Sequence, residues 1–267
     1  MAEPAAPATG KTNELQTRII VGVILIVAAV LAEYFGGLFL WFLVVLMALG
    51  IMSEWSRLAG RQENRLLAMY ALSVPLAIMS PWAAGPSFLA LGLIMGAAMF
   101  VAVFDRSFKL AAGVFYAGLP ALAIIYLRDV DNGILLVFWT LALVWATDIG
   151  AYFSGRAIGG PKLAPKYSPN KTWAGLVGGV ALTAAVSYGL HLYWELPLYL
   201  VLLSIPLAVL AQMGDLFESW LKRRAGVKDS GTIFPGHGGV MDRLDGLIPV
   251  APVVAMIMLV ENLSALS

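Results

Sequence analysis

Cysteine is absent from this 267-residue sequence, and charged residues make up only 12% of it. The lack of cysteine excludes disulfides, thiolate metal sites and cysteine catalysis. A soluble domain usually has ~25% charged residues, so this chain has too little polar surface to be covered by water on all sides. The net charge of +1 creates no strong electrostatic field, and we therefore expect no nucleic-acid partner.

Apolar residues form 60% of the chain and fall into long blocks. A helix needs about 20 apolar residues to cross a bilayer core, whereas barrel strands have ~10 residues and alternate in polarity. The blocks therefore predict an all-α polytopic integral membrane protein. Reading between charged and Pro/Gly positions gives nine transmembrane spans, near residues 18 to 34, 37 to 53, 66 to 83, 87 to 104, 110 to 127, 133 to 153, 173 to 193, 197 to 214 and 244 to 261.

The distribution of basic residues predicts the orientation of these spans. If the N-terminus is cytoplasmic, sixteen of the seventeen Lys and Arg residues lie on the cytoplasmic side and only Arg128 lies outside. The positive-inside rule requires this asymmetry. We expect a protein of the bacterial cytoplasmic (inner) membrane, surrounded by membrane lipids and associated through its helix faces as a homodimer.

The chain divides by composition into three parts. Residues 1–16 are predicted to form a disordered cytoplasmic tail, residues 17–132 a set of plain N-terminal transmembrane helices, and residues 133–267 a C-terminal transmembrane catalytic region. Only the last part has long cytoplasmic loops rich in Gly, Pro, Lys and Asp. We therefore expect the chemistry there.

The first polar group of this region lies at the cytoplasmic end of the sixth span. Asp148, Tyr152 and Gly155 share one helix face at i, i+4 and i+7. A carboxylate in a membrane segment usually faces a protein interior or an aqueous cavity and indicates a functional site. The alternative is a structural ion pair or a hydrogen bond between packed helices.

The loop after the sixth span is basic. Ser168-Pro169 is a turn signal, and Thr172 is a candidate N-cap for the seventh helix. Lys171 and its neighbours beside a helix N-terminus form a candidate anion site, since backbone N–H groups and the helix dipole favour phosphate there. Alternatively, these lysines only set the topology.

The second polar group follows the eighth span. If the helix continues, Asp215, Glu218, Ser219 and Lys222 form one polar stripe. Mg²⁺ typically takes one or two protein carboxylates and completes its shell with water and substrate phosphates, so this sparse set suits it. A solvated end of an amphipathic helix is the alternative.

The third group contains Lys228-Asp229-Ser230-Gly231, His237-Gly238-Gly239 and Asp242-Arg243-Leu244-Asp245. Glycine-rich backbone can approach phosphate closely, and Asp242 with Asp245 is a second carboxylate pair. Antiparallel packing of the sixth, eighth and ninth spans would bring all three groups to one membrane face. The combination indicates metal-assisted phosphoryl or nucleotidyl transfer.

The run from Ser219 to Asp245 resembles the signature of the phosphatidate cytidylyltransferase, or CDP-diacylglycerol synthase, family without a departure from its pattern. Residues 148–152 and 168–172 also resemble bacterial members. The resemblance implies transfer of the cytidylyl group of CTP to phosphatidic acid, which gives CDP-diacylglycerol and pyrophosphate and requires Mg²⁺. On this basis we expect catalytic roles for Asp215, Lys222, Asp242 and Asp245, metal ligation by Asp215, Asp242 and Asp245 supported by Asp148 and Glu218, and substrate contacts from Lys171, Arg223, Lys228, His237 and Arg243.

Two other classes of membrane protein fit these residues less well. In an ion-coupled transporter, Asp148, Asp215 and Asp242 would line a path open to both faces, but the acids instead gather at the cytoplasmic end with basic residues and glycine. The CDP-alcohol phosphotransferases need Ala-Arg soon after Asp-Gly, whereas Asp245-Gly246 leads into Leu247-Ile248-Pro249. The transferase interpretation is the stronger one.

Overall fold

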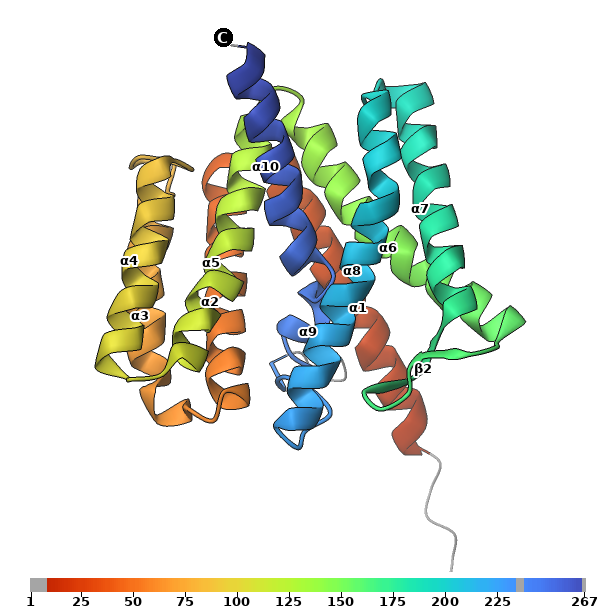
Figure 1. Ribbon diagram of the computed structural model, residues 1–267, viewed down its shortest axis with the longest axis horizontal. Helices are drawn as coiled ribbons and strands as arrows, with labels where there is room; N and C mark the ends of the chain where they lie inside the picture. Colours follow the sequence, from red (N-terminus) through yellow and green to blue (C-terminus); the bar gives the residue numbers. More distant parts are fainter. Residues whose placement is uncertain (1–8, 234–237, 266–267) are drawn as a thin grey trace, which may run out of the picture.

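The structure is a computed structural model and describes residues 9–233 and 238–265. Over these residues the chain forms a bundle of long helices with one small hairpin (Figure 1). The elements are α1 (Thr9–Phe35), α2 (Gly37–Leu58), η1 (Gln62–Asn64), α3 (Arg65–Ile78), α4 (Phe88–Phe104), α5 (Phe108–Asp129), α6 (Gly133–Ile158), β1 (Lys162–Ala164), β2 (Ser168–Thr172), α7 (Trp173–Trp194), α8 (Leu198–Arg224), α9 (Met241–Leu244) and α10 (Leu247–Ala265).

The bundle confirms the predicted all-α membrane class. Within the described residues, six helices are long and apolar enough to cross a membrane: α2, α5, α6, α7, α8 and α10. The apolar parts of α1 and α4 are shorter, and α3 has 14 residues with Pro75 inside it. Large apolar side chains such as Phe39, Tyr70 and Val103 are exposed on the outside of the bundle. An apolar exterior of this kind fits a lipid environment.

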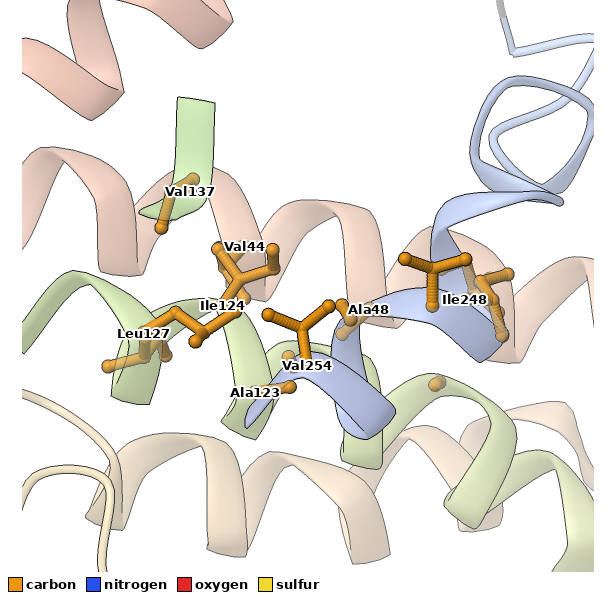
Figure 2. Close-up of a cluster of buried hydrophobic side chains, with 14 of the residues drawn as sticks. Val44, Ala48, Ala123, Ile124, Leu127, Val137, Ile248 and Val254 are labelled. Atoms are coloured by element: carbon orange, nitrogen blue, oxygen red, sulfur yellow. The ribbon is translucent and has the colours of Figure 1, made fainter. Parts of the chain in front are cut away.

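The core forms where α5 packs against α2, α4 and α10. Buried residues of α5 recur at helical spacing, as in Ala117, Ala121 and Ile124, so that one face of the helix is continuously apolar. Figure 2 shows side chains from four helices meeting there, among them Val44, Ile124, Val137 and Val254. This core holds the N-terminal helices against the C-terminal ones.

Glycines bring α6 and α7 close together. A methyl group on Gly150 would lie 2.6 Å from the carbonyl oxygen of Gly178, and one on Gly179 would lie 2.7 Å from the carbonyl oxygen of Thr147. Small residues allow this close approach, which is a common way of packing helices in membranes. The contact places the C-terminal half of α6 directly beside the start of α7.

The hairpin corrects one expectation from the sequence. Ser168-Pro169 was expected to form a turn, but these residues begin β2, which pairs antiparallel with β1 in the register Lys162 to Thr172. The predicted cap is confirmed, because the Thr172 hydroxyl accepts a hydrogen bond from the N–H of Gly175 (3.0 Å). The hairpin therefore delivers Lys171 to the N-terminus of α7.

The two ends of the bundle differ in the elements and polar residues that they carry. The hairpin, α9 and the first turns of α1 lie at one end, and α10 finishes at the other (Figure 1). Helix α1 starts at Thr9, inside the segment 1–16 that its composition assigns to a tail. All three polar groups identified in the sequence belong to the end that carries the hairpin and α9, which we call the polar end.

Candidate active site

An ion pair between the hairpin and α8 forms one side of the site. Lys171 Nζ contacts Oδ2 of Asp215, and both side chains are largely shielded from solvent. The α8 helix runs on to Arg224, as the polar-stripe prediction required, and Ser219 donates a hydrogen bond to Oδ1 of Asp215 (3.4 Å). The carboxylate of Asp215 thus joins two segments that are separate in the sequence, residues 162–172 and 214–223.

Lys222 forms the other side of the site, where it lies between two carboxylates. Its Nζ is 3.2 Å from Oε1 of Glu218 and 2.6 Å from Oδ1 of Asp242. Glu218 is completely buried. A buried carboxylate needs a close counter-charge, because an unpaired one is strongly destabilising. Lys222 therefore balances Glu218 and also ties α8 to α9.

Asp242 organises the backbone before α9. Its Oδ2 accepts hydrogen bonds from the N–H of Ser230 (2.9 Å), the hydroxyl of Ser230 (2.9 Å) and the N–H of Gly239 (2.7 Å). Burial acts to raise the pKa of Asp242, but the hydrogen bonds from Lys222 and Gly239 outweigh it and lower the pKa to about 2. Asp242 is therefore ionised at any physiological pH.

Asp245 lies one turn further along, among other acids. The charges of Asp215 and Asp148 act on Asp245 electrostatically. Lys171 interacts electrostatically with Asp148 as well as with Asp245 and Asp215. Asp148, Asp215 and Asp245 thus form an acidic cluster around one lysine, and this cluster would be stabilised by additional positive charge.

Close helix packing positions this cluster. A methyl group on Gly214 would lie 2.7 Å from Cγ of Pro249 and would also collide with the carbonyl oxygen of Asp245. The absence of a side chain at Gly214 therefore lets α8 pack against the turn between α9 and α10. This contact sets Asp215 and Asp245 beside each other.

The comparisons with known proteins identify the family of the chain. The model of the Cytidylyltransferase family matches residues 16–260. The chain belongs to this family. A phosphatidate cytidylyltransferase of Brucella suis biovar 1 (strain 1330) is 40% identical to the chain over 253 residues, which are 90% of the chain and 91% of that protein. A phosphatidate cytidylyltransferase of Rickettsia bellii (strain RML369-C) is 31% identical over 255 residues, 92% of the chain and 91% of that protein.

Family membership confirms the class of enzyme predicted from the sequence. A cytidylyltransferase transfers a nucleotidyl group, which is the chemistry that the carboxylates, basic residues and glycines indicate. Nothing in the comparisons supports the transporter alternative. The similarity extends over the N-terminal helices, where the sequence by itself offered no motif.

Four further basic residues of this cytidylyltransferase-family protein were predicted to contact substrate: Arg243, Arg223, Lys228 and His237. Arg243 interacts electrostatically with Asp148. Arg223 is exposed and donates hydrogen bonds to the carbonyl oxygens of Tyr167 (3.5 Å) and Val227 (3.4 Å). Lys228 is exposed in the following loop, and His237 lies outside the described residues. Their predicted substrate contacts stay predictions.

Glu54 of α2 contacts the site but lies outside the sequence motifs. This carboxylate is buried, and it accepts hydrogen bonds from the N–H groups of Val240 (2.8 Å) and Met241 (2.9 Å) and from the hydroxyl of Ser230 (2.8 Å). The sequence pattern could have indicated that Glu54 is buried, because helical spacing places it beside the buried residues Ile51 and Trp55. A carboxylate on the buried face of an apolar helix needs a partner, and here the partners are the backbone of Val240 and Met241 and the hydroxyl of Ser230.

An apolar cavity of about 350 Å³ opens beside the site. Its walls come from α1, α2, α5, α6 and the beginning of α10, with Val44, Ile124 and Ile248 among the lining residues. Some of these side chains are visible in Figure 2. Arg243 also contributes to the lining, so the cavity connects the apolar interior of the bundle with the polar end.

Proposed function

We propose that this protein transfers the cytidylyl group of CTP to phosphatidic acid, giving CDP-diacylglycerol and pyrophosphate for phospholipid synthesis. One observation supports this assignment above all. The acidic cluster and its basic neighbours lie at the end of a membrane bundle, directly beside an apolar cavity that shares Arg243 with the site. A water-soluble nucleotide and a bilayer lipid can meet only at such a boundary.

The chemistry requires charge neutralisation more than proton transfer. An oxygen of the lipid phosphate attacks the α-phosphorus of CTP, and the bond from that phosphorus to the pyrophosphate oxygen breaks. The attacking phosphate is already ionised, so no general base is needed. Lys171, Lys222 and Arg243 neutralise the charge that develops on the leaving pyrophosphate, with Arg223 and Lys228 as further phosphate contacts nearer to solvent.

The acidic cluster suits Mg²⁺. Among the residues that the structure describes, no three acidic or histidine side chains converge as a complete metal site. Mg²⁺ commonly binds through one or two carboxylates and takes its other ligands from water and substrate phosphates. We assign Asp215 and Asp245 as the residues that would hold it, with Asp148 in support. The ion would polarise the phosphate oxygens of the nucleotide.

Asp242 and Glu218 have a different role in the proposed mechanism. Both oxygens of Asp242 already accept hydrogen bonds from Lys222, Ser230 and Gly239, and Glu218 is buried behind Lys222. We assign these two carboxylates to holding Lys222 and the backbone before α9 rather than to direct ligation of the metal. They remain essential for the shape of the site.

The lipid would enter from the apolar side. The cavity is wide enough for part of an acyl chain, and Arg243 in its lining supplies a positive charge for the phosphate headgroup. An acyl chain that moves from the bilayer into such a cavity stays in an apolar environment, so this transfer has little hydrophobic cost. This arrangement would keep the lipid in the membrane while its phosphate reaches the nucleotide.

We further propose nine transmembrane spans with a cytoplasmic N-terminus, in the bacterial inner membrane, and assembly as a homodimer. The concentration of Lys and Arg at the polar end supports this orientation. Arg128 is the basic residue that this orientation places on the outer side. Its Nε lies 3.0 Å from the carbonyl oxygen of the buried Glu33 and 3.4 Å from Oε1 of the same residue. Because a buried carboxylate requires a counter-charge, this pairing accounts for a basic residue on that side.

Turnover by the purified protein tests the proposed reaction. The protein in detergent with phosphatidic acid, labelled CTP and Mg²⁺ should place the label in lipid, and chelation of the metal should stop the reaction. Asp215→Asn should remove nearly all turnover, because the amide keeps the shape but loses the charge. Asp131→Asn, an exposed carboxylate outside the three polar groups, is the control. If the wild-type protein produced no labelled lipid, the assignment would be refuted.

A further inference from the structure

Helix α2 belongs to the part of the chain without a catalytic motif, yet residues of its last turns contact the segment around Ser230. Glu54 and Arg57 are separated by one turn and both reach the backbone around Ser230. Arg57 donates to the carbonyl oxygens of Ser230 and Asp229 (the latter at 3.2 Å). Glu54 accepts from the other side of the same segment.

The Glu54 carboxylate is enclosed by that backbone. Its Oε1 accepts from the N–H of Val240, and its Oε2 accepts from the N–H of Met241 and the Ser230 hydroxyl. A methyl group on Gly231 or on Gly239 would collide with Glu54 oxygens. The absence of side chains at these two glycines therefore leaves room for the Glu54 carboxylate. The backbone and this carboxylate are closely complementary in shape.

Ser230 links this carboxylate to that of Asp242. Its hydroxyl lies 2.8 Å from Oε2 of Glu54 and 2.9 Å from Oδ2 of Asp242. A hydroxyl has one proton to donate, so the two carboxylates compete for it, while the N–H of Ser230 still holds Asp242. Displacement of Glu54 would therefore change the position of Ser230 and, through it, that of Asp242.

We propose that Glu54 is a positioning residue of the active site, which fixes Ser230 and the Val240–Met241 backbone so that Asp242 is oriented toward Lys222. Glu54 acts through these groups and does not touch the reacting phosphates. The inference rests on the proposed function for its kinetic readout only, because the hydrogen bonds themselves can be followed without turnover.

Glu54→Gln tests the proposal, since the amide is the same size but has one acceptor oxygen in place of two. We expect kcat to fall about 10- to 100-fold, as loss of a hydrogen bond to a charged group does, while KM for CTP changes little. Hydrogen–deuterium exchange of a peptide covering residues 238–244 should accelerate, because Val240 and Met241 lose a partner. Glu63→Gln, an exposed glutamate of η1, should change neither quantity.

Ser230→Ala gives the second measurement and covers the case in which Glu54→Gln does not fold. It removes only the linking hydroxyl, and we expect a similar loss of kcat that is not additive with that of Glu54→Gln. Normal kcat in either folded single variant, or fully additive losses in the double variant, would overturn the proposal. If the wild type transfers no cytidylyl group at all, unchanged exchange at residues 238–244 in Glu54→Gln would still overturn it, and faster exchange would support it.

Discussion

Lys222 serves two carboxylates at once, which makes it the most informative single residue of the site. Lys222→Ala should lower kcat/KM about 10- to 100-fold, because a charge-assisted hydrogen bond to phosphate is worth roughly 1.5 to 3 kcal/mol. Turnover of CTP and phosphatidic acid measures this. Lys109→Ala is the control, since that side chain is exposed in the first turn of α5, outside the motifs.

A second substitution, at Glu218, distinguishes two roles of Lys222: neutralisation of Glu218 and contact with substrate phosphate. Glu218→Gln removes the buried charge that Lys222 balances. If Lys222 only neutralises Glu218, adding Glu218→Gln to Lys222→Ala should restore activity. If Lys222 also contacts substrate phosphate, the double variant should stay impaired, as we expect. Equal, small effects at Lys109 and Lys222 would contradict any phosphate contact.

At the scale of elements, the contact between α8 and the α9–α10 turn decides whether the acids meet. Gly214→Ala places a methyl group against Asp245 and Pro249, and overpacking of this kind costs typically 1–3 kcal/mol. We expect a lower thermal stability and a marked loss of turnover, because α8 must shift away from Asp245. Thermal unfolding and turnover of the purified protein measure the two effects.

Gly189→Ala is the matched control for this substitution. Gly189 also lies inside a helix, α7, but a methyl group there would meet nothing within 4 Å. Alanine is intrinsically favoured over glycine in a helix by roughly 1 kcal/mol. Gly189→Ala should therefore leave stability unchanged or raise it. A similar response of both variants would show that the α8 contact is not tight.

At the scale of the whole molecule, the proposed orientation places the polar end in the cytoplasm. The chain has no cysteine, so each introduced cysteine is a unique label site. Ala225→Cys and Asp131→Cys lie at exposed positions on opposite sides of the proposed topology. In intact cells an impermeant thiol reagent should label position 131 and not position 225. The reverse pattern would overturn the orientation.

The sequence by itself determined the membrane class and the main parts of the site. Composition and block length decide which solvent a chain can face, and these are properties of the sequence before folding. The stripe Asp215, Glu218, Lys222 was also predictable, since helical periodicity is local. The Thr172 cap followed from the same local rules.

Only the tertiary structure decided how these parts combine. The pairing of Lys171 with Asp215 and the division of the acids into a cluster around Lys171 and a group held by Lys222 depend on helix packing. The contact of Glu54 with Met241 joins residues 187 positions apart. Periodicity shows that Glu54 faces inward but cannot identify its partner, because the partner is chosen by the packing of α2 against a distant segment of the folded chain.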